Sequence, residues 1–318
     1  MPSSSSSPTS STSPSLSSSS PTRKNPYQVI RELGSGLQGR VVLAFDEHER
    51  RYVAIKLPSV FETAASNGHN AVDLRLLDYQ VQSIVQERRA LRFVGSHPNV
   101  LQYVRMVPGS KMNQSYVALV TEYASNGDLF DLIADTGAFD EDLAKFYFAQ
   151  LLSDQFTMKL CDFGLATVVA PSRGEHVDQI VLRDVSGTGL YMAPEISRTT
   201  PYRATPTDLW SAGVVLFIML TGFPPFQEAA RDDHWYECVV QGEMDKLWEA
   251  QCDVAEMLSA DARDMIAGLL CSNADKRLTI ADCFAHPWMQ DVDMVDRKWV
   301  VEEMTARRLV ALNASATI

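Results

Sequence analysis

Two stretches near the start of the chain, Gly34-Ser-Gly-Leu-Gln-Gly-Arg-Val41 and Val53-Ala-Ile-Lys56, are the most informative about its fold. The first fits the pattern G-x-G-x-x-G-x-V, whose three glycines also occur in dinucleotide-binding turns. In those turns the glycines open a helix, whereas here Gly39 leads into Arg40–Phe45, an apolar run typical of a strand. A glycine loop between two strands is suited to cover phosphates, because backbone N–H groups come close where Cβ atoms are missing.

The chain around these stretches has a β-rich front and a helical back. β-branched and aromatic runs separated by turn residues predict an antiparallel meander, and apolar residues at helical spacing predict helices. Two lobes are therefore expected, with a join near Glu122–Gly127. The expected strands cover residues 27–33, 40–46, 52–57, 100–107 and 116–122, and the expected helices cover 72–94 and most of the chain after residue 128.

Charge and cysteine content narrow the class of protein. The 28 Lys and Arg against 40 Asp and Glu give a net charge of −12, which argues against nucleic acid and an anionic membrane surface as partners. The five cysteines contain no C-x-x-C pair, which argues against a disulfide framework and a structural zinc site. Because the apolar run Ala212–Phe223 is also too short to span a bilayer, we expect an intracellular protein, cytoplasmic or nuclear.

The first 24 residues differ in composition from the rest. Of residues 1–22, 20 are Ser, Thr or Pro, so this stretch has too little apolar surface to fold and is expected to be a disordered tail. It contains three Ser-Pro steps, at Ser7, Ser13 and Ser20. They are candidate targets of an upstream kinase, and the alternative is a featureless tether.

Further motifs follow the glycine loop and Lys56 in a fixed order. Lys56 alone could be a solvated strand end, and Glu87 a solvated helix face, but the whole series resembles a eukaryotic protein kinase of the serine/threonine type. The motifs that carry the resemblance are Glu87 on the helix, His97-Pro-Asn99, Asp162-Phe-Gly164, Gly187-Thr188, Ala193-Pro-Glu195, Asp208-Leu-Trp-Ser-Ala-Gly213, Arg277 and His286-Pro-Trp288.

The resemblance implies an α+β, bilobal fold over residues 25–289. A small antiparallel β-sheet lobe with one helix would take residues 25–124, and a larger helical lobe would take 125–289. Residues 290–318 would form a helical tail. A helix over 293–312 would either lie against the large lobe or act as an autoinhibitory or calmodulin-binding segment.

The resemblance also implies ATP and Mg²⁺ as cofactors. Lys56 would bind phosphate and be oriented by Glu87, while Asp162 would coordinate Mg²⁺. The other residues expected to contact ATP are Gly34, Gly36, Gly39, Val41, Ala54, Glu122, Ala124 and, beside the ribose and the peptide substrate, Asp128.

The other residues carried over from the family are structural or regulatory. Asp208 would be a buried carboxylate that orients backbone amides, and Arg277 with Glu195 would be a buried ion pair, each costing on the order of 3–5 kcal/mol to break. In the activation segment, Thr188 would face the catalytic loop, Asp184 would stand in place of a phosphorylated threonine or be a solvated charge, and Ser186 would be a phosphosite.

One departure from the family lies between Ser153 and Asp154. The sequence passes from the helix ending near Leu152 almost directly to Lys159-Leu-Cys-Asp162, and roughly 22 residues of the family pattern, including H-R-D-x-K-x-x-N, have no counterpart. The Asp that orients the substrate hydroxyl and the Asn that holds a second Mg²⁺ are therefore missing, and we expect an inactive or severely impaired enzyme. An omitted exon is one explanation, and a pseudokinase that binds nucleotide or protein partners is the other.

The substrates are inferred by analogy. Leu220-Thr-Gly-Phe-Pro-Pro-Phe226 resembles the calcium/calmodulin-dependent-kinase-like group. With Asp128 and the acidic balance of the chain, this likeness favours protein substrates with basic motifs.

Overall fold

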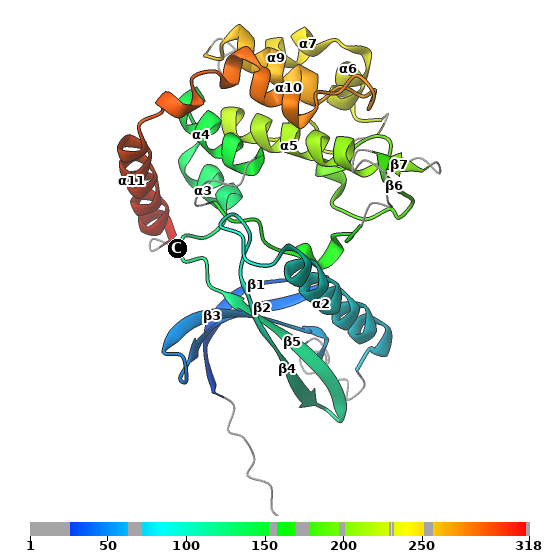
Figure 1. The fold of residues 1–318 in the computed structure, drawn as a ribbon, viewed down its shortest axis with the longest axis vertical. Coiled ribbons are helices and arrows are strands. Elements are labelled where there is room, and N and C mark those ends of the chain that lie inside the picture. Colours follow the sequence, from blue (N-terminus) through cyan, green and yellow to red (C-terminus); the bar gives the residue numbers. More distant parts are fainter. Residues whose placement is uncertain are drawn as a thin grey trace, which may run out of the picture.

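The structure is a computed structural model in which two lobes lie one above the other (Figure 1). It describes residues 26–62, 72–152, 158–169, 179–196, 201–228, 230, 232–250 and 257–315. The serine-rich tail, most of the segment between Glu62 and Asp73 and the junction at 153–154 lie outside the described residues. The predicted α+β fold, with an antiparallel sheet in the small lobe and helices in the large one, is confirmed.

The small lobe is a five-stranded antiparallel sheet in the order β1-β2-β3-β5-β4. One face of the sheet carries an apolar cluster that includes Val42, Val53 and Val120. The strands are β1 (Tyr27–Gly36), β2 (Gly39–Asp46), β3 (Arg51–Leu57), β4 (Tyr103–Lys111) and β5 (Gln114–Glu122).

The opposite face of this sheet carries the residues expected to bind the nucleotide. In the antiparallel register Val41 pairs with Lys56, and Ala54 pairs with Thr121. Directly opposed residues share a face, and so do residues two apart along a strand. The register therefore places Val41, Ala54, Lys56 and Thr121 together on one face.

One long helix, α2 (Leu74–Val94), packs beside the sheet (Figure 1). It begins where the Asp73 side chain accepts hydrogen bonds from the backbone of Arg75 and Leu76, and it ends at Gly95, whose φ of 74° favours glycine. Ile84 and Leu91 of this helix form a buried cluster with Leu119 of β5, which ties α2 to the sheet.

The large lobe is built around α5 (Ala204–Thr221), whose Trp210, Leu216 and Phe217 are fully buried. By length and composition alone α5 could cross a membrane, but 72% of it is buried inside the lobe, as in the core helix of a globular domain. The surrounding helices are α3 (Leu129–Thr136), α4 (Glu141–Leu152), α6 (His234–Gln241), α7 (Met244–Ala250), α9 (Ala260–Leu269) and α10 (Ile280–Ala285).

Short elements complete the large lobe. They are the strands β6 (Val181–Leu182) and β7 (Tyr202–Arg203), and the 3₁₀ turns η1 (Phe163–Leu165), η3 (Gly189–Tyr191), η4 (Pro287–Met289) and η5 (Val292–Met294).

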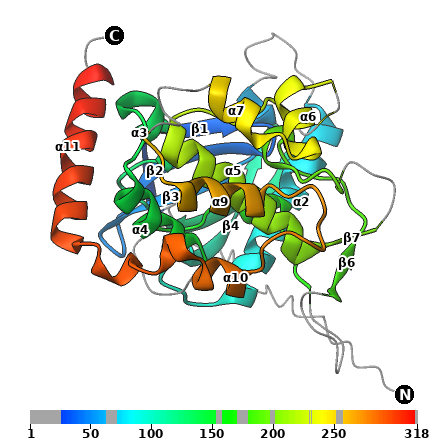
Figure 2. The ribbon, with the colours of Figure 1, turned by 90° about the horizontal axis from the view of Figure 1, so that it is seen from above.

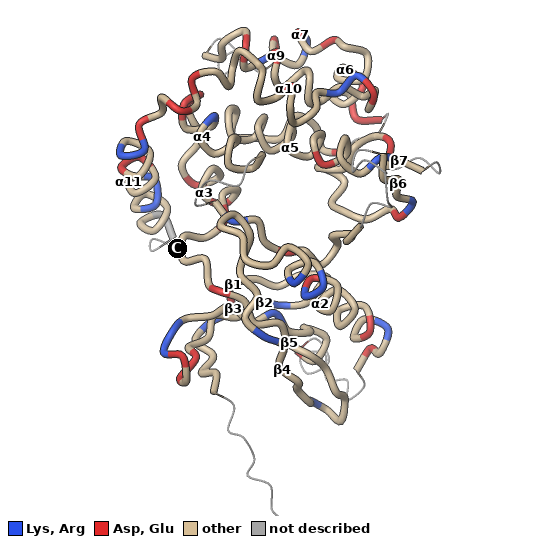
Figure 3. The backbone as a smooth tube through the Cα atoms, in the orientation of Figure 1, with Lys and Arg blue, Asp and Glu red and all other residues tan. Residues whose placement is uncertain are grey.

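A C-terminal helix, α11 (Arg297–Ser315), lies along α3 in both views (Figures 1 and 2). Arg307 donates to the backbone carbonyls of Gly137 at 2.9 Å and Ala138 at 3.0 Å, and its guanidinium lies 4.9 Å from the ring centroid of Phe139. The rest of α11 carries charges of both signs (Figure 3). One arginine thus satisfies carbonyls that follow α3, which anchors the helix to the large lobe.

A buried ion pair holds the end of the activation segment to the large lobe. Arg277, whose side chain is 0% exposed, donates to both carboxylate oxygens of Glu195, at 2.7 and 3.1 Å. It also donates to the carbonyls of Cys271 and Pro206, and its guanidinium lies 5.1 Å from the ring centroid of Trp210. The structure thus brings Arg277 and Glu195 together as the sequence predicts.

Replacing Glu195 with alanine tests this ion pair. We expect Glu195→Ala to lower the free energy of unfolding by about 3–5 kcal/mol in urea, because the guanidinium stays buried without its partner. Asp275→Ala is the matched control, since it removes the partner of Arg203 in a pair whose side chains are 37% and 83% exposed. That control should cost less than about 1 kcal/mol. Equal losses in the two variants would contradict the assignment.

Candidate nucleotide and phosphate site

Lys56 of β3 is the centre of a charged cluster between the two lobes. Its ammonium lies 2.8 Å from Glu87 Oε2 of α2 and 2.6 Å from Asp162 Oδ1. Lys56 and Glu87 are only 8% and 4% exposed, whereas the Asp162 side chain is 57% exposed. The structure therefore brings together the three residues predicted for phosphate and Mg²⁺, and leaves the carboxylate of Asp162 open to solvent.

Burial and charge act together on this pair. Burial alone would lower the pKa of Lys56, but the negative charges of Glu87 and Asp162 outweigh it, so the pKa of Lys56 is raised. Burial raises the pKa of Glu87, and the opposing charge of Lys56 offsets this only in part. The lysine is thus held firmly in its charged form, as a phosphate ligand requires.

The segment after Asp162 is docked on α2. Asp162 has a left-handed backbone conformation, with φ 60°, and opens the 3₁₀ turn η1. The backbone of Phe163 hydrogen-bonds to Glu87, and the Gln86 side chain donates to the carbonyl of Ala166 at 2.6 Å. Helix α2 therefore fixes the direction in which Asp162 points.

A further residue, Gln38, belongs to this cluster and was not predicted. Its Oε1 atom accepts hydrogen bonds from Lys56 Nζ at 3.2 Å and from Ser83 Oγ of α2 at 2.7 Å. Gln38 occupies an unspecified position of the glycine pattern, so only its polar, donor- and acceptor-bearing side chain could have singled it out.

The three glycines of the loop differ in whether a side chain would fit at their positions. A Cβ atom at Gly34 or Gly36 would meet nothing within 4 Å, so their surroundings leave room for a ligand to approach the backbone. Gly39 has φ 124°, and a Cβ there would overlap the carbonyl oxygen of Leu57. Only Gly39 is therefore required by the fold itself.

The residues predicted for the base and the ribose lie at the join between the lobes. The Glu122 carboxylate pairs with Lys159 at 2.8 Å and accepts from the backbone of Gln102, while Ala124 is exposed. Asp128 caps α3 by accepting from the backbone N–H of Asp131 at 2.7 Å. Its negative charge raises the pKa of the Asp131 carboxyl.

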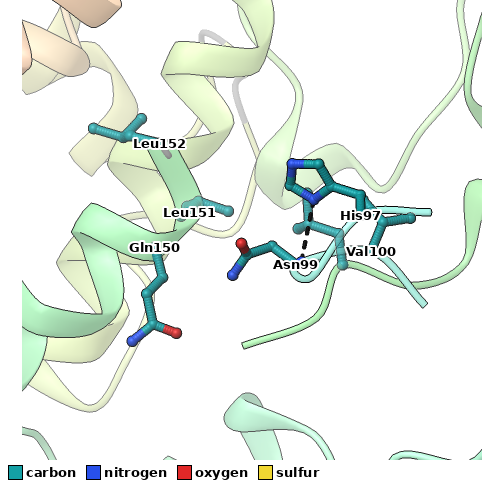
Figure 4. A pocket seen from close by; sticks show the side chains of 7 residues that line it. His97, Asn99, Val100, Gln150, Leu151 and Leu152 are labelled. Carbon is teal, nitrogen blue, oxygen red and sulfur yellow. Dashed lines mark hydrogen bonds between the residues drawn. The ribbon is translucent and has the colours of Figure 1, made fainter. Parts of the chain in front are cut away.

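The segment before Asp162 pairs with the loop that leads into β4. Leu160 donates to the carbonyl of Asn99 at 2.7 Å and accepts from Leu101 at 2.9 Å, in a parallel bridge. A hollow of about 450 Å³ lies beside it (Figure 4). It is lined by His97, Asn99, Val100 and Leu160 together with Gln150, Leu151 and Leu152 at the end of α4.

Asp208 departs from the prediction. It was expected to be buried, but it is exposed, and no hydrogen bond from the described residues reaches its carboxylate. Desolvation by the surrounding protein nevertheless raises its pKa, with no favourable charge or hydrogen bond to offset it. Among the described residues, no backbone amide donates a hydrogen bond to the Asp208 carboxylate, so the amide-orienting role expected of it has no partner in this part of the chain.

The predicted residues of the activation segment are exposed. Asp184, Ser186 and Thr188 all face solvent, and the carbonyl of Asp184 accepts from the hydroxyl of Tyr202 at 2.5 Å. Their exposure is compatible with modification or with a solvated loop, so their predicted roles stay predictions.

A sheet lobe with a glycine loop, a Lys–Glu pair between strand and helix, and a helical lobe define a protein kinase. The protein kinase domain model matches residues 27–154 and 151–289, so the chain belongs to the protein kinase family. Members of this family generally use ATP and a divalent metal ion.

Similar proteins include serine/threonine kinases of plants, which supports the serine/threonine type. Serine/threonine-protein kinase SAPK1 of Oryza sativa subsp. japonica is 26% identical over 289 residues, covering 82% of this chain and 75% of that protein. Serine/threonine-protein kinase SRK2A of Physcomitrium patens is 25% identical over 303 residues, covering 87% of this chain and 79% of that protein. Membership of the calcium/calmodulin-dependent-kinase-like group stays a prediction.

Replacing Asp208 with asparagine tests its altered surroundings. Because its pKa is raised in the folded state, the charged carboxylate destabilises the fold above the ordinary aspartate pKa of about 3.9, and this cost disappears below it. Asp208→Asn should therefore leave the free energy of unfolding at pH 7 unchanged or slightly higher, and any gain should vanish in acid. A loss of about 3–5 kcal/mol at pH 7 would instead indicate a carboxylate with buried partners.

Proposed function

We propose that this chain is a serine/threonine protein kinase family member that binds the phosphates of ATP with Mg²⁺ but does not transfer phosphate at an appreciable rate. The observation that carries the proposal is the intact Lys56–Glu87–Asp162 cluster in a chain whose 318 residues contain no H-R-D. The phosphate end of the site thus has its charges in place, whereas the residues that orient the acceptor hydroxyl have no counterpart.

The chemistry explains why this combination binds without transferring. Phosphoryl transfer asks the protein for positioning and charge neutralisation more than for covalent work. Lys56 neutralises phosphate charge, and Asp162 offers an exposed carboxylate to Mg²⁺. Losing the group that accepts the hydroxyl proton typically costs a factor of about 10²–10⁴, and losing the second metal ligand adds to that cost.

The residues present fit the nucleotide phosphates and one Mg²⁺ ion. Among the described residues no group of three or more His, Cys, Asp and Glu could hold a metal ion without other ligands. Asp162 would therefore share the ion with phosphate oxygens and water, as Mg²⁺ commonly does. When bound, Mg²⁺–ATP supplies the phosphoryl group and the neutralising cation.

An omitted segment explains the departure better than a decayed kinase does. The helix before the junction and the Lys159–Gly164 motif after it keep the family pattern. The two stretches matched by the family model meet at residues 151–154. A decayed kinase usually carries scattered substitutions instead. The alternative, a pseudokinase that serves as a regulatory scaffold, is favoured by the same intact phosphate cluster.

The substrates of the complete enzyme would be proteins with basic residues near the phosphorylated Ser or Thr. Asp128 and Asp131 lie exposed at the start of α3, and the charge of Asp128 raises the pKa of the Asp131 carboxyl. Two carboxylates that repel one another in this way both gain from a nearby cation.

Nucleotide binding should depend on Lys56. We expect Lys56→Ala to weaken binding of ADP with Mg²⁺ by about tenfold or more in calorimetry, because a charge-assisted hydrogen bond to phosphate is lost. Lys298→Ala is the matched control, since it removes the same charge from an 83% exposed side chain on α11. Equal affinities for Lys56→Ala and Lys298→Ala would reject the phosphate site.

Phosphate transfer should be absent from the chain as it stands. Incubation with Mg²⁺ and labelled ATP should leave a mixture of Ser and Thr peptides unlabelled, although the protein binds the nucleotide. Labelling that Lys56→Ala abolishes would show that the proposal of an inactive enzyme is wrong.

The genomic sequence around the codons of Ser153 and Asp154 can show why the catalytic-loop segment is missing. An omitted segment predicts that genomic DNA between the codons of Ser153 and Asp154 contains an in-frame stretch encoding H-R-D-x-K-x-x-N. A contiguous genomic reading frame across this junction would reject that explanation and leave the pseudokinase.

A further inference from the structure

We propose that Gln38 is a latch that holds the glycine loop closed on α2, so that nucleotide phosphates reach Lys56 only by displacing its side chain. The inference rests on the proposed function, because it concerns the same phosphate site. The closed latch is the resting state of that site.

The first observation is the bonding of the Gln38 amide oxygen. This atom accepts from Lys56 Nζ at 3.2 Å and from Ser83 Oγ at 2.7 Å. A carbonyl oxygen has two lone pairs, so both are in use. The neutral amide oxygen thus occupies, on the lysine, the place that an anionic phosphate oxygen would take.

The second observation is a separate anchor on the preceding residue. The Gln80 side chain donates to the carbonyl of Leu37 at 3.1 Å. Gln80 is 1% exposed and is held in turn by Ser59, which donates its backbone N–H at 2.9 Å and accepts at its hydroxyl at 2.9 Å. The Gln80 side chain is therefore oriented by Ser59 as well as by the loop.

The two anchors come from one face of α2. Gln80 and Ser83 are three residues apart, so they lie one helical turn from each other. They hold Leu37 and Gln38, the two residues of the turn between the paired glycines Gly36 and Gly39. Both residues at the tip of the glycine loop are thus hydrogen-bonded to α2.

The third observation is the close approach of the Gln38 side chain to Gly164, which follows Asp162 in the large lobe. A Cβ atom at Gly164 would overlap both Gln38 Oε1 and Ser83 Oγ. The Gln38 side chain therefore spans the site from the glycine loop to the motif that begins with Asp162. In this conformation the Gln38 amide oxygen lies against both Lys56 Nζ and Gly164.

The physical consequence is a competition for Lys56. Phosphate binds an ammonium by charge-assisted hydrogen bonds, which are stronger than the bond to a neutral amide. Nucleotide therefore displaces Gln38, but its apparent affinity is reduced by the fraction of molecules in which the latch is closed. Release of Leu37 and Gln38 from α2 accompanies nucleotide entry.

Calorimetric titration with ADP and Mg²⁺ tests the latch in full-length protein. Gln38→Ala and Ser83→Ala should each bind the nucleotide about three- to tenfold more tightly than the unaltered chain, since each removes a hydrogen bond of the closed state. The double variant should bind no more tightly than Gln38→Ala, because both changes open the same latch. Gln28→Ala, at an exposed residue of β1, is the control and should not change the affinity.

Weaker binding by Gln38→Ala would overturn the proposal, because it would make Gln38 a ligand of the nucleotide instead of its competitor. Unchanged binding by Gln38→Ala and Ser83→Ala would overturn it too.

Amide hydrogen exchange without nucleotide separates this proposal from the proposed function. Backbone amides of residues 36–39 should exchange faster in Gln38→Ala and Ser83→Ala than in the unaltered chain and in Gln28→Ala. If no protein in the series binds nucleotide, the proposed function fails and the exchange rates alone decide the latch. Equal exchange rates in all four proteins would then overturn it.

Discussion

The buried ion pair between Lys56 and Glu87 is the interaction on which the rest of the site depends. Lys56 Nζ of the sheet lies 2.8 Å from Glu87 Oε2 of α2, and the same carboxylate accepts a hydrogen bond from the backbone of Phe163. Both partners are desolvated, so removing either would leave an uncompensated buried charge. This constraint keeps the phosphate end of the site assembled whatever happens to the segment that orients the acceptor hydroxyl.

Motifs predicted this end of the site because their chemistry needs specific residues. A phosphate site needs a lysine, the lysine needs a carboxylate, and an Mg²⁺ ligand needs another, so Lys56, Glu87 and Asp162 could be named from the sequence. Gln38 could not, because the glycine pattern leaves its position unspecified. The roles of Gln80 and Ser83 depend on which face of α2 meets the loop tip, and only the three-dimensional arrangement shows that.

Whether a predicted residue is buried depended on the segments that surround it in the fold. The Arg277–Glu195 pair is buried as predicted, because the segments that enclose it are present. The burial predicted for Asp208 is wrong, because burial is a property of surrounding residues and not of a motif. The C-terminal helix was expected, but that one of its arginines binds the carbonyls after α3 could not be read from the amphipathic pattern. Residues whose chemistry requires one another can therefore be predicted from a motif, whereas the burial and contacts of a residue depend on the segments around it.

Insertion of the family's catalytic-loop segment between Ser153 and Asp154 would show whether phosphate transfer is absent because this segment is missing. The inserted piece would carry H-R-D-x-K-x-x-N and its following hairpin, roughly 22 residues. We predict that the folded, nucleotide-binding chimera gains labelled phosphate transfer to Ser or Thr peptides, and that changing its H-R-D aspartate to asparagine removes the gain. A chimera that folds and binds nucleotide but still transfers no phosphate would contradict the claim that this segment is what the chain lacks.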